Sequence, residues 1–132
     1  AFGFAHTPQG AALAGMQAAA RALRSGDDLR AVYDRQVIAD PGVVDTKLAQ
    51  LEAAGDSDFR VGRAWVFPEA FKVTSYTDAT AVVQYATPIP GAGRWDNQQS
   101  TLIWSDGDWK VRLPAVEVQL SPVTTLNGFT RW

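Results

Sequence analysis

The chain has 132 residues, no cysteine and a formal net charge of -2. This length suits one domain, residues 1–132, that folds around its own core. The absence of cysteine excludes disulfides and thiolate metal sites, and the scattered basic residues argue against direct binding of nucleic acid.

The first predicted helix starts at Thr7-Pro8 and ends at Ser25-Gly26. Threonine is a good N-cap and proline is well tolerated at the first helical position, whereas glycine suits the left-handed residue that ends many helices. The apolar residues that recur at helical spacing predict the face that packs on the rest of the domain. They are Leu13, Met16, Ala20 and Leu23.

Two further helices are expected before the sheet. Asp27 or Asp28 can cap a second helix, which Asp40-Pro41-Gly42 would stop. Its apolar stripe consists of Leu29, Val32, Tyr33, Gln36 and Val37. A shorter third helix is predicted from Asp45 to Ala54. Residues 65–68 then read as an approach to the sheet or an edge strand, and the hydrophobic period changes from 3.6 to 2.

The alternation that follows predicts a first antiparallel hairpin. Phe71 would pair with Tyr85 and Val73 with Val83 on its apolar face. The next segment, residues 87–97, holds two prolines, two glycines and Trp95, and we expect it to form a long surface loop.

A second hairpin, Ser100–Leu113, carries the clearest local signal. Asp106-Gly107 suits a type I′ turn, in which both central residues have positive φ angles. This turn places Trp104 opposite Trp109 on an apolar face, against which we expect the first helix to pack. The pairs Leu102 with Val111, Ile103 with Lys110 and Thr101 with Arg112 follow from the same register. Residues 116–120 alternate as a short strand.

This order of elements predicts an α+β fold. Two or three N-terminal helices would pack on a curved antiparallel sheet of four or more strands, in a nuclear-transport-factor-like or cystatin-like arrangement. Folds of this shape host enzymes, binding modules and scaffolds alike, so the function must be argued from particular residues.

Few residues in the sequence suit catalysis. His6 is the only histidine, and it could serve as an acid, a base or a metal ligand, or make a structural contact. We expect no metal site and no cofactor. Tyr33, Asp34 and Tyr85 could line a pocket like that of ketosteroid-isomerase-like enzymes, with Asp34 as the base. The alternative is that the tyrosines belong to the core and Asp34 is solvated.

A partner surface is the other candidate site. Trp95 and Trp132 could pack back on the domain or serve as exposed anchors for a partner. An exposed Trp95 would also suit a module that binds a polymer such as peptidoglycan. The candidate partner surface comprises Trp95, Arg94, Ile103, Lys110, Arg112 and Trp132.

Three stretches of the chain resemble one known family. They are Gly3–Ala14 (GFAHTPQGAALA), Gly107–Pro114 (GDWKVRLP), and Leu126–Phe129 (LNGF) with the final Trp132. They are similar to an uncharacterised actinobacterial domain family associated with integrative and conjugative elements, whose members usually carry a membrane anchor before a domain outside the membrane. Thr130-Arg131 replaces the Val-Pro that this family would have before the tryptophan.

The resemblance implies a non-enzymatic assembly domain on the extracytoplasmic side of the cell envelope. It would act as a scaffold component of conjugative DNA transfer, with protein partners in an envelope complex and self-association as one option. Because the chain begins with Ala1, we expect an excised domain or a mature product, attached to the membrane only through an anchor outside this sequence. The alternative is a pocketed small-molecule binder or an isomerase-like enzyme of the same fold class.

Overall fold

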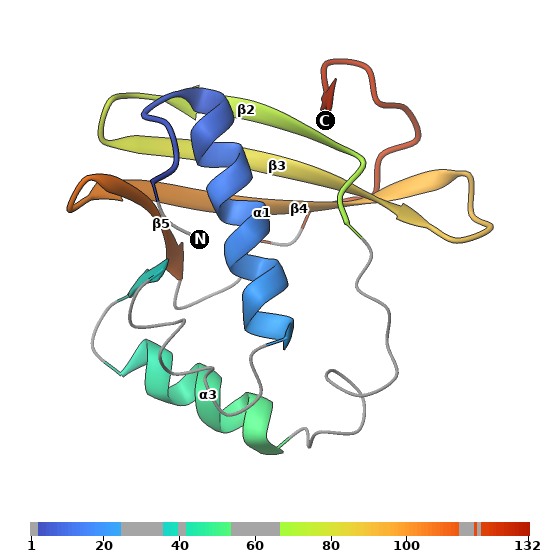
Figure 1. Cartoon of the computed structure of the whole chain (residues 1–132). Helices are drawn as coiled ribbons and strands as arrows, with labels where there is room; N and C mark the ends of the chain where they lie inside the picture. Colours follow the sequence, from blue (N-terminus) through green and yellow to red (C-terminus); the bar gives the residue numbers. More distant parts are fainter. Residues whose placement is uncertain (1–2, 25–35, 40–41, 54–66, 114–117, 119) are drawn as a thin grey trace.

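A computed structural model describes residues 3–24, 36–39, 42–53, 67–113, 118 and 120–132. In this part of the chain a twisted sheet is covered on one face by the longer helix, and the shorter helix lies beyond it (Figure 1). The helices are α1 (Pro8–Arg24) and α3 (Val43–Ala53). The strands are β1 (Val37–Ala39), β2 (Ala70–Tyr76), β3 (Thr80–Ile89), β4 (Arg94–Ser105), β5 (Asp108–Leu113) and β6 (Thr130–Arg131).

The sheet is six-stranded and mixed, in the order β1-β5-β4-β3-β2-β6. Only β1 and β5 are parallel neighbours; the other neighbouring pairs are antiparallel. The predicted fold class, two or three helices on an antiparallel sheet of four or more strands, is therefore wrong. Among the described residues there is one long helix and one short one, and the sheet gains two short strands from segments far apart in sequence.

Both predicted hairpins are confirmed in register. Phe71 pairs with Tyr85 and Val73 with Val83, and a bulge between Val73 and Ser75 shifts the pairing nearer the turn. In the second hairpin Trp104 pairs with Trp109, as expected from a two-residue turn. Asp106 and Gly107 have φ angles of 54° and 76°, which are the positive values that a type I′ turn requires.

The long loop predicted for residues 87–97 is instead the end of the β3–β4 hairpin. β3 continues to Ile89, and β4 begins at Arg94 after a short turn. Proline is tolerated inside β3 because Pro88 pairs with Trp95, whose backbone N–H and C=O both bond to Val123 rather than to β3. The nitrogen of Pro88 therefore points away from β4, where no ladder bond is lost.

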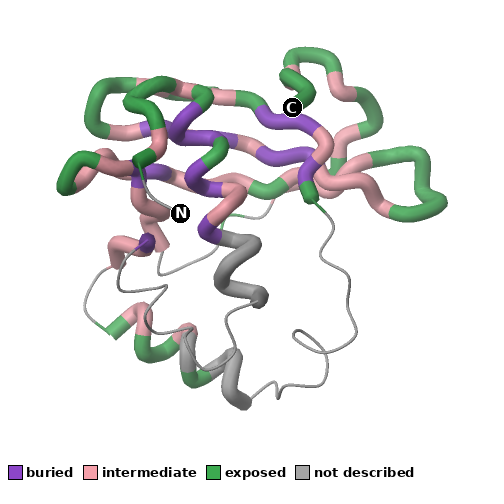
Figure 2. The backbone as a smooth tube through the Cα atoms, in the orientation of Figure 1, coloured by how far each residue is buried: buried purple, intermediate pink, exposed green. Residues whose placement is uncertain are grey.

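The predicted start of α1 is confirmed by its capping contact. The backbone N–H of Gly10 donates to Oγ1 of Thr7 at 3.0 Å, which satisfies one of the free donors of the first turn. The helix packs on the sheet mainly through small residues, since Ala11, Ala12, Ala14, Gly15 and Ala18 are buried. Figure 2 shows buried positions in the part of the helix that lies over the strands. Of the predicted apolar seam, Leu13 is 38% exposed and Met16 packs, partly buried, against the core, while the side chains of Ala20 and Leu23 lie outside the described ones.

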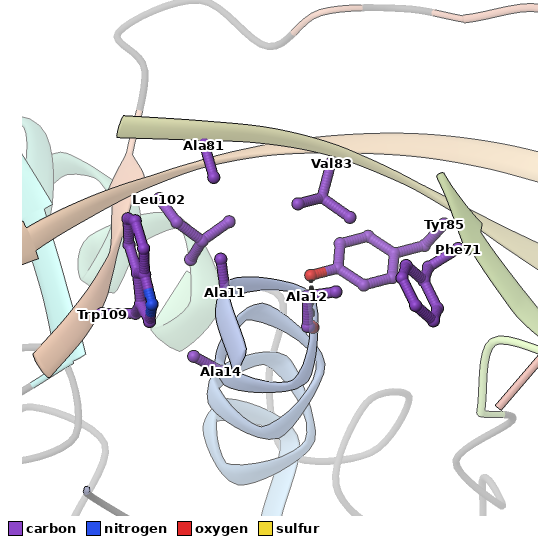
Figure 3. Close-up of a cluster of buried hydrophobic side chains, with 9 residues drawn as sticks. All are labelled: Ala11, Ala12, Ala14, Phe71, Ala81, Val83, Tyr85, Leu102 and Trp109. Carbon is purple, nitrogen blue, oxygen red and sulfur yellow. Dashed lines mark hydrogen bonds between the residues drawn. The ribbon is translucent and has the colours of Figure 1, made fainter. Parts of the chain in front are cut away.

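Small residues occupy the face of α1 that contacts the sheet, because they let the helix axis approach the strands closely. A Cβ added to Gly15 would overlap Oη of Tyr85, and that hydroxyl donates to the carbonyl oxygen of Ala12 at 2.7 Å. Alanines from the helix and larger side chains from the strands point toward one another in one continuous core (Figure 3). Its buried members are Ala11, Ala12, Ala14, Phe71, Ala81, Val83, Tyr85, Leu102 and Trp109.

The remaining predictions for the chain have mixed outcomes. α3 begins two residues before the predicted Asp45, directly after Gly42, whose φ is +85°. Most of the predicted second helix, including residues 27–35, lies outside the described residues, but Val37, which belongs to its expected apolar stripe, begins strand β1. Val118 and Leu120, from the strand predicted at 116–120, have no regular structure.

Candidate functional site

Residues Gly3–Thr7, the N-terminal latch, run along the start of β5. The carboxylate of Asp108 accepts hydrogen bonds from the backbone N–H of Gly3 at 3.0 Å and of Phe4 at 3.1 Å. The indole N–H of Trp109 donates to the carbonyl of Ala5 at 3.0 Å. The first stretch of the family resemblance is thereby tied to the second, at a separation of about a hundred residues in sequence.

His6, the only histidine, is a member of this latch. Its Nε2 lies 2.5 Å from the carbonyl oxygen of Asp78, and its ring stacks on Trp104 with centroids 3.9 Å apart and planes 2° apart. Its backbone carbonyl accepts a hydrogen bond from the hydroxyl of Tyr76 at 3.3 Å. These contacts hold the latch on two hairpin ends, so His6 has a structural role in this geometry.

Residues Val123–Trp132, the C-terminal clasp, cross to the opposite edge of the sheet. Val123 pairs with Trp95 on β4, and β6 pairs with the beginning of β2. The ring of Trp132 lies 4.5 Å from that of Phe71, measured between centroids, and Nζ of Lys72 lies 5.8 Å from the ring centroid of Phe129. The third stretch of the resemblance is thus also part of the structural framework.

Glu69 joins the clasp to β4. One carboxylate oxygen accepts a hydrogen bond from the indole N–H of Trp95 at 2.8 Å, and the other pairs with the guanidinium of Arg131. The bond from Trp95, followed by that from Arg131, lowers the pKa of Glu69 below its ordinary value. This carboxylate is consequently held in its charged form by two partners from distant parts of the chain.

The predicted pocket lining is not assembled in the described structure. Tyr85 is buried under α1, where desolvation raises the pKa of its phenol and its hydroxyl bonds the helix backbone. Tyr33 and Asp34 lie outside the described residues. The structure therefore places Tyr85 in the core, which is the alternative that the sequence left open for the tyrosines.

The predicted partner-surface residues fall into three places. Ile103 and Lys110 are cross-strand neighbours, and Arg112 follows on the same face two residues along β5. Lys110 also pairs with Asp106 at 3.2 Å. Arg94 is exposed at the other end of β4, next to the half-buried Trp95. Trp132, 48% exposed, lies across the sheet beside β2.

A cavity of about 470 Å³ adjoins β4 and the end of β5, a site that the sequence interpretation missed. Its lining combines amides, hydroxyls and two charged groups with aliphatic side chains from β5 and the segment after it. The lining residues are Asp96, Asn97, Gln98, Gln99, Ser100, Thr101, Val111, Arg112, Leu113, Val118 and Leu120. The expected loop at 87–97 hid this site, because it placed Asp96 and Asn97 outside the sheet.

Other functional signatures are absent from the part of the chain that the structure describes. Within it, no three residues among histidine, aspartate and glutamate are grouped so that they could hold a metal ion. Neither described helix is both long and apolar enough to cross a membrane.

Comparison with known proteins places the whole chain in one family. A family model described as a domain of unknown function, DUF8175, matches residues 1–131. No curated protein and no solved structure matches the chain. The expectation that the chain belongs to an uncharacterised domain family is confirmed by this match, whereas its link to actinobacterial conjugative elements stays a prediction.

Proposed function

Since the chain belongs to the DUF8175 family, whose function is unknown, we propose a function from the chain's own geometry. It is a non-enzymatic protein-interaction domain that serves assembly of a complex on the extracytoplasmic side of the cell envelope. The process we propose is conjugative DNA transfer, and this part of the proposal is supported by the three-stretch resemblance alone.

The single observation that carries the proposal is the filled interface between α1 and the sheet. Ketosteroid-isomerase-like enzymes would use this face for a substrate pocket, with Tyr85 in its wall. Here a row of alanines and Gly15 touches the sheet directly, and the Tyr85 hydroxyl is engaged by the Ala12 carbonyl (Figure 3). A close-packed interface of this kind supports a scaffold rather than an enzyme that works between helix and sheet.

The contacts of His6 and Glu69 also support a non-enzymatic function. His6, the only histidine, and Glu69 are bound to structural partners at opposite edges of the sheet. General acid–base catalysis requires a group that is free to reach a substrate. Both groups instead fasten the chain ends that contain the stretches of the resemblance.

The proposal is tested by deleting the gene in a donor strain and measuring conjugative transfer. Transfer should be abolished and restored by the intact gene supplied in trans. A complementing copy with Ile103→Asp and Lys110→Glu should fail if the outer face of β4 and β5 contacts a partner, while a copy with Gln9→Ala on exposed helix surface should succeed. Normal transfer from the deletion strain would refute the assignment to conjugation.

A second candidate, a small-molecule binder, is favoured by the cavity beside β4. Its volume of about 470 Å³ lies in the range typical of ligand pockets. Tyr85 is not among its lining residues, so this candidate differs from the isomerase-like pocket expected from the sequence. A polymer-stacking role for Trp95 gains no such support, because Trp95 is half-buried and its indole N–H is bound to Glu69.

A further inference from the structure

The chain has two asparagines, and they differ in neighbour and in setting. Asn127 directly precedes Gly128 in the C-terminal clasp and is exposed. Asn97 lies inside β4, is half-buried and precedes Gln98. The backbone nitrogen that follows an asparagine can attack the side-chain carbonyl carbon of that asparagine, and glycine hinders this attack least because it has no side chain. Asn127 is therefore the asparagine at which the attack is expected.

Asn127 and Gly128 are the central residues of a tight turn. The backbone N–H of Phe129 donates to the carbonyl of Leu126 at 3.0 Å, and Gly128 has a φ angle of +82°, whereas the φ angle of Asn127 is not positive. These features define a type II turn. A ring that joins the Asn127 side chain to the Gly128 nitrogen needs the Cβ of Asn127 and this nitrogen nearly eclipsed about the Cα–C bond, whereas a type II turn holds them about 120° apart. The turn must open before the ring can form.

The rest of the clasp keeps this turn closed. Before the turn, Val123 exchanges two backbone hydrogen bonds with Trp95 on β4. After the turn, β6 pairs with the beginning of β2, and the ring of Trp132 lies against that of Phe71. Both residues of β6 are exposed and Trp132 is half-exposed, which is a setting in which local opening costs little free energy. When β6 leaves β2, the ψ angle of Asn127 is free to change.

We propose that Asn127 is a site of spontaneous deamidation whose rate is set by opening of the C-terminal clasp. A closed clasp protects the side-chain amide, and an open clasp allows the Gly128 nitrogen to reach it. The reaction consumes water and requires no enzyme. This inference is independent of the proposed function, because it uses only the turn and the contacts that hold it.

The reaction proceeds in two steps through a succinimide ring. In the first step the backbone nitrogen of Gly128 loses its proton to water or hydroxide and bonds to Cγ of Asn127, while the bond from Cγ to the side-chain nitrogen breaks and ammonia leaves. In the second step water adds to one of the two ring carbonyl carbons, and the bond from this carbon to the Gly128 nitrogen breaks as the nitrogen takes up a proton. Attack of water at Cγ leaves an aspartate, and attack at the backbone carbonyl leaves an isoaspartate.

The isoaspartate product changes the clasp itself. Its main chain runs through the former side chain and is longer by one methylene group. The added length lies between Val123 and Thr130, which are held by different strands of the sheet. The change also adds a negative charge next to Gly128, where Nζ of Lys72 lies 3.7 Å from the position of a Cβ built on this glycine. We expect the aspartate product to retain the clasp and the isoaspartate product to loosen it.

Incubation of the intact chain at mildly alkaline pH, followed by peptide mapping with mass spectrometry, tests the proposal. Asn127 should convert to the acid while Asn97 stays intact. The reference for an open turn is the acetylated and amidated peptide threonine-leucine-asparagine-glycine-phenylalanine-threonine, which should react at least about tenfold faster than the folded chain. Trp132→Ala, which weakens the clasp, should accelerate conversion of Asn127 about fivefold to tenfold. Asp108→Ala in the latch is the matched control and should change the rate less than about twofold.

The outcomes separate the site from the way it is controlled. Failure of Asn127 to convert in Trp132→Ala, while the peptide reacts, would overturn the site. Equal rates in the folded chain and the peptide would overturn the protection by the clasp. Equal acceleration by Trp132→Ala and Asp108→Ala would also overturn it, because unfolding of the whole domain would then be the controlling step. Circular dichroism verifies that both variants are folded, and Glu69→Gln, which removes the ion pair with Arg131, should accelerate conversion as a second clasp variant.

Discussion

The N-terminal latch and the C-terminal clasp hold the two described chain ends in different ways. The latch joins backbone groups to Asp108 and to the buried Trp109, next to the main core. The clasp relies on a two-residue strand, an exposed guanidinium and a half-exposed Trp132. Because hydrogen bonds beside a buried ring gain more free energy than exposed contacts, the latch, whose bonds to Phe4 and Trp109 are partly buried, should contribute more to stability than the clasp. The first and third stretches of the family resemblance, which lie in the latch and the clasp, are therefore expected to stabilise the fold to different degrees.

The largest expected effect comes from Gly10→Ala. A Cβ at this position would overlap the Ala5 carbonyl oxygen, which is backbone and also accepts from Trp109. The latch must then move, and we expect the free energy of unfolding to fall by about 1–3 kcal/mol. Urea denaturation measures the change, with Gln9→Ala on the exposed side of the same turn as control. A stability equal to that of the control would contradict the close approach.

A second effect, of about 1–3 kcal/mol, is expected from Asp108→Ala. The substitution leaves the N–H groups of Gly3, Phe4 and Trp109 without their carboxylate acceptor. Amide hydrogen exchange should accelerate at Phe4 while remaining unchanged at Phe129 in the clasp. Asp78→Ala, which changes an exposed side chain and keeps the backbone carbonyl that His6 contacts, is the control. Equal exchange in both variants would show that Asp108 does not hold the latch.

A smaller effect is expected from Trp132→Ala in the clasp. Trp132 is about half exposed, so its removal loses only part of the apolar area that a fully buried tryptophan would contribute. A loss of about 1–2 kcal/mol follows from the usual value per unit of buried area. Denaturation of this variant beside Gly10→Ala compares the two supports directly, and a greater loss for Trp132→Ala would reverse their ranking.

The smallest effect is the pH dependence that Glu69 contributes. Its folded-state pKa lies below the ordinary value of 4.5, so the charged carboxylate stabilises the folded state. That contribution is complete above the unfolded pKa and is lost as the pH falls from about 4.5 through the folded pKa. The difference in stability between the wild type and Glu69→Gln should be constant near neutrality and shrink below this pH. A difference that grows on acidification would contradict the sign.

The sequence predicted local features well because their causes are local. The Asp106-Gly107 turn and strict alternation set the register of the second hairpin, and Thr7 sets the start of α1. Leu13 was wrongly placed on the packed face because periodicity ranks side chains by hydrophobicity, whereas this interface is decided by how near Gly15 can come to Tyr85. Large residues such as Leu13 would have held the helix away from the sheet.

The missed strands depend on partners that are distant in sequence. β1 and β6 contain three and two residues, too few to show a period, and each forms only because β5 or β2 offers an edge. Trp95 was assigned to a loop because prolines and glycines dominate its neighbourhood. Local composition cannot show that the backbone groups of Trp95 bond to Val123. Because these groups point away from β3, Pro88, which lies opposite Trp95, needs no hydrogen bond to β4.

The placement of Pro88 has a consequence for self-association. The long β3–β4 hairpin extends past the end of β2 (Figure 1), and there the edge of β3 carries a proline whose nitrogen cannot donate. A strand of a second copy that paired with this edge would lack one backbone hydrogen bond at Pro88. The proline therefore makes edge-to-edge association at this end of the hairpin less favourable.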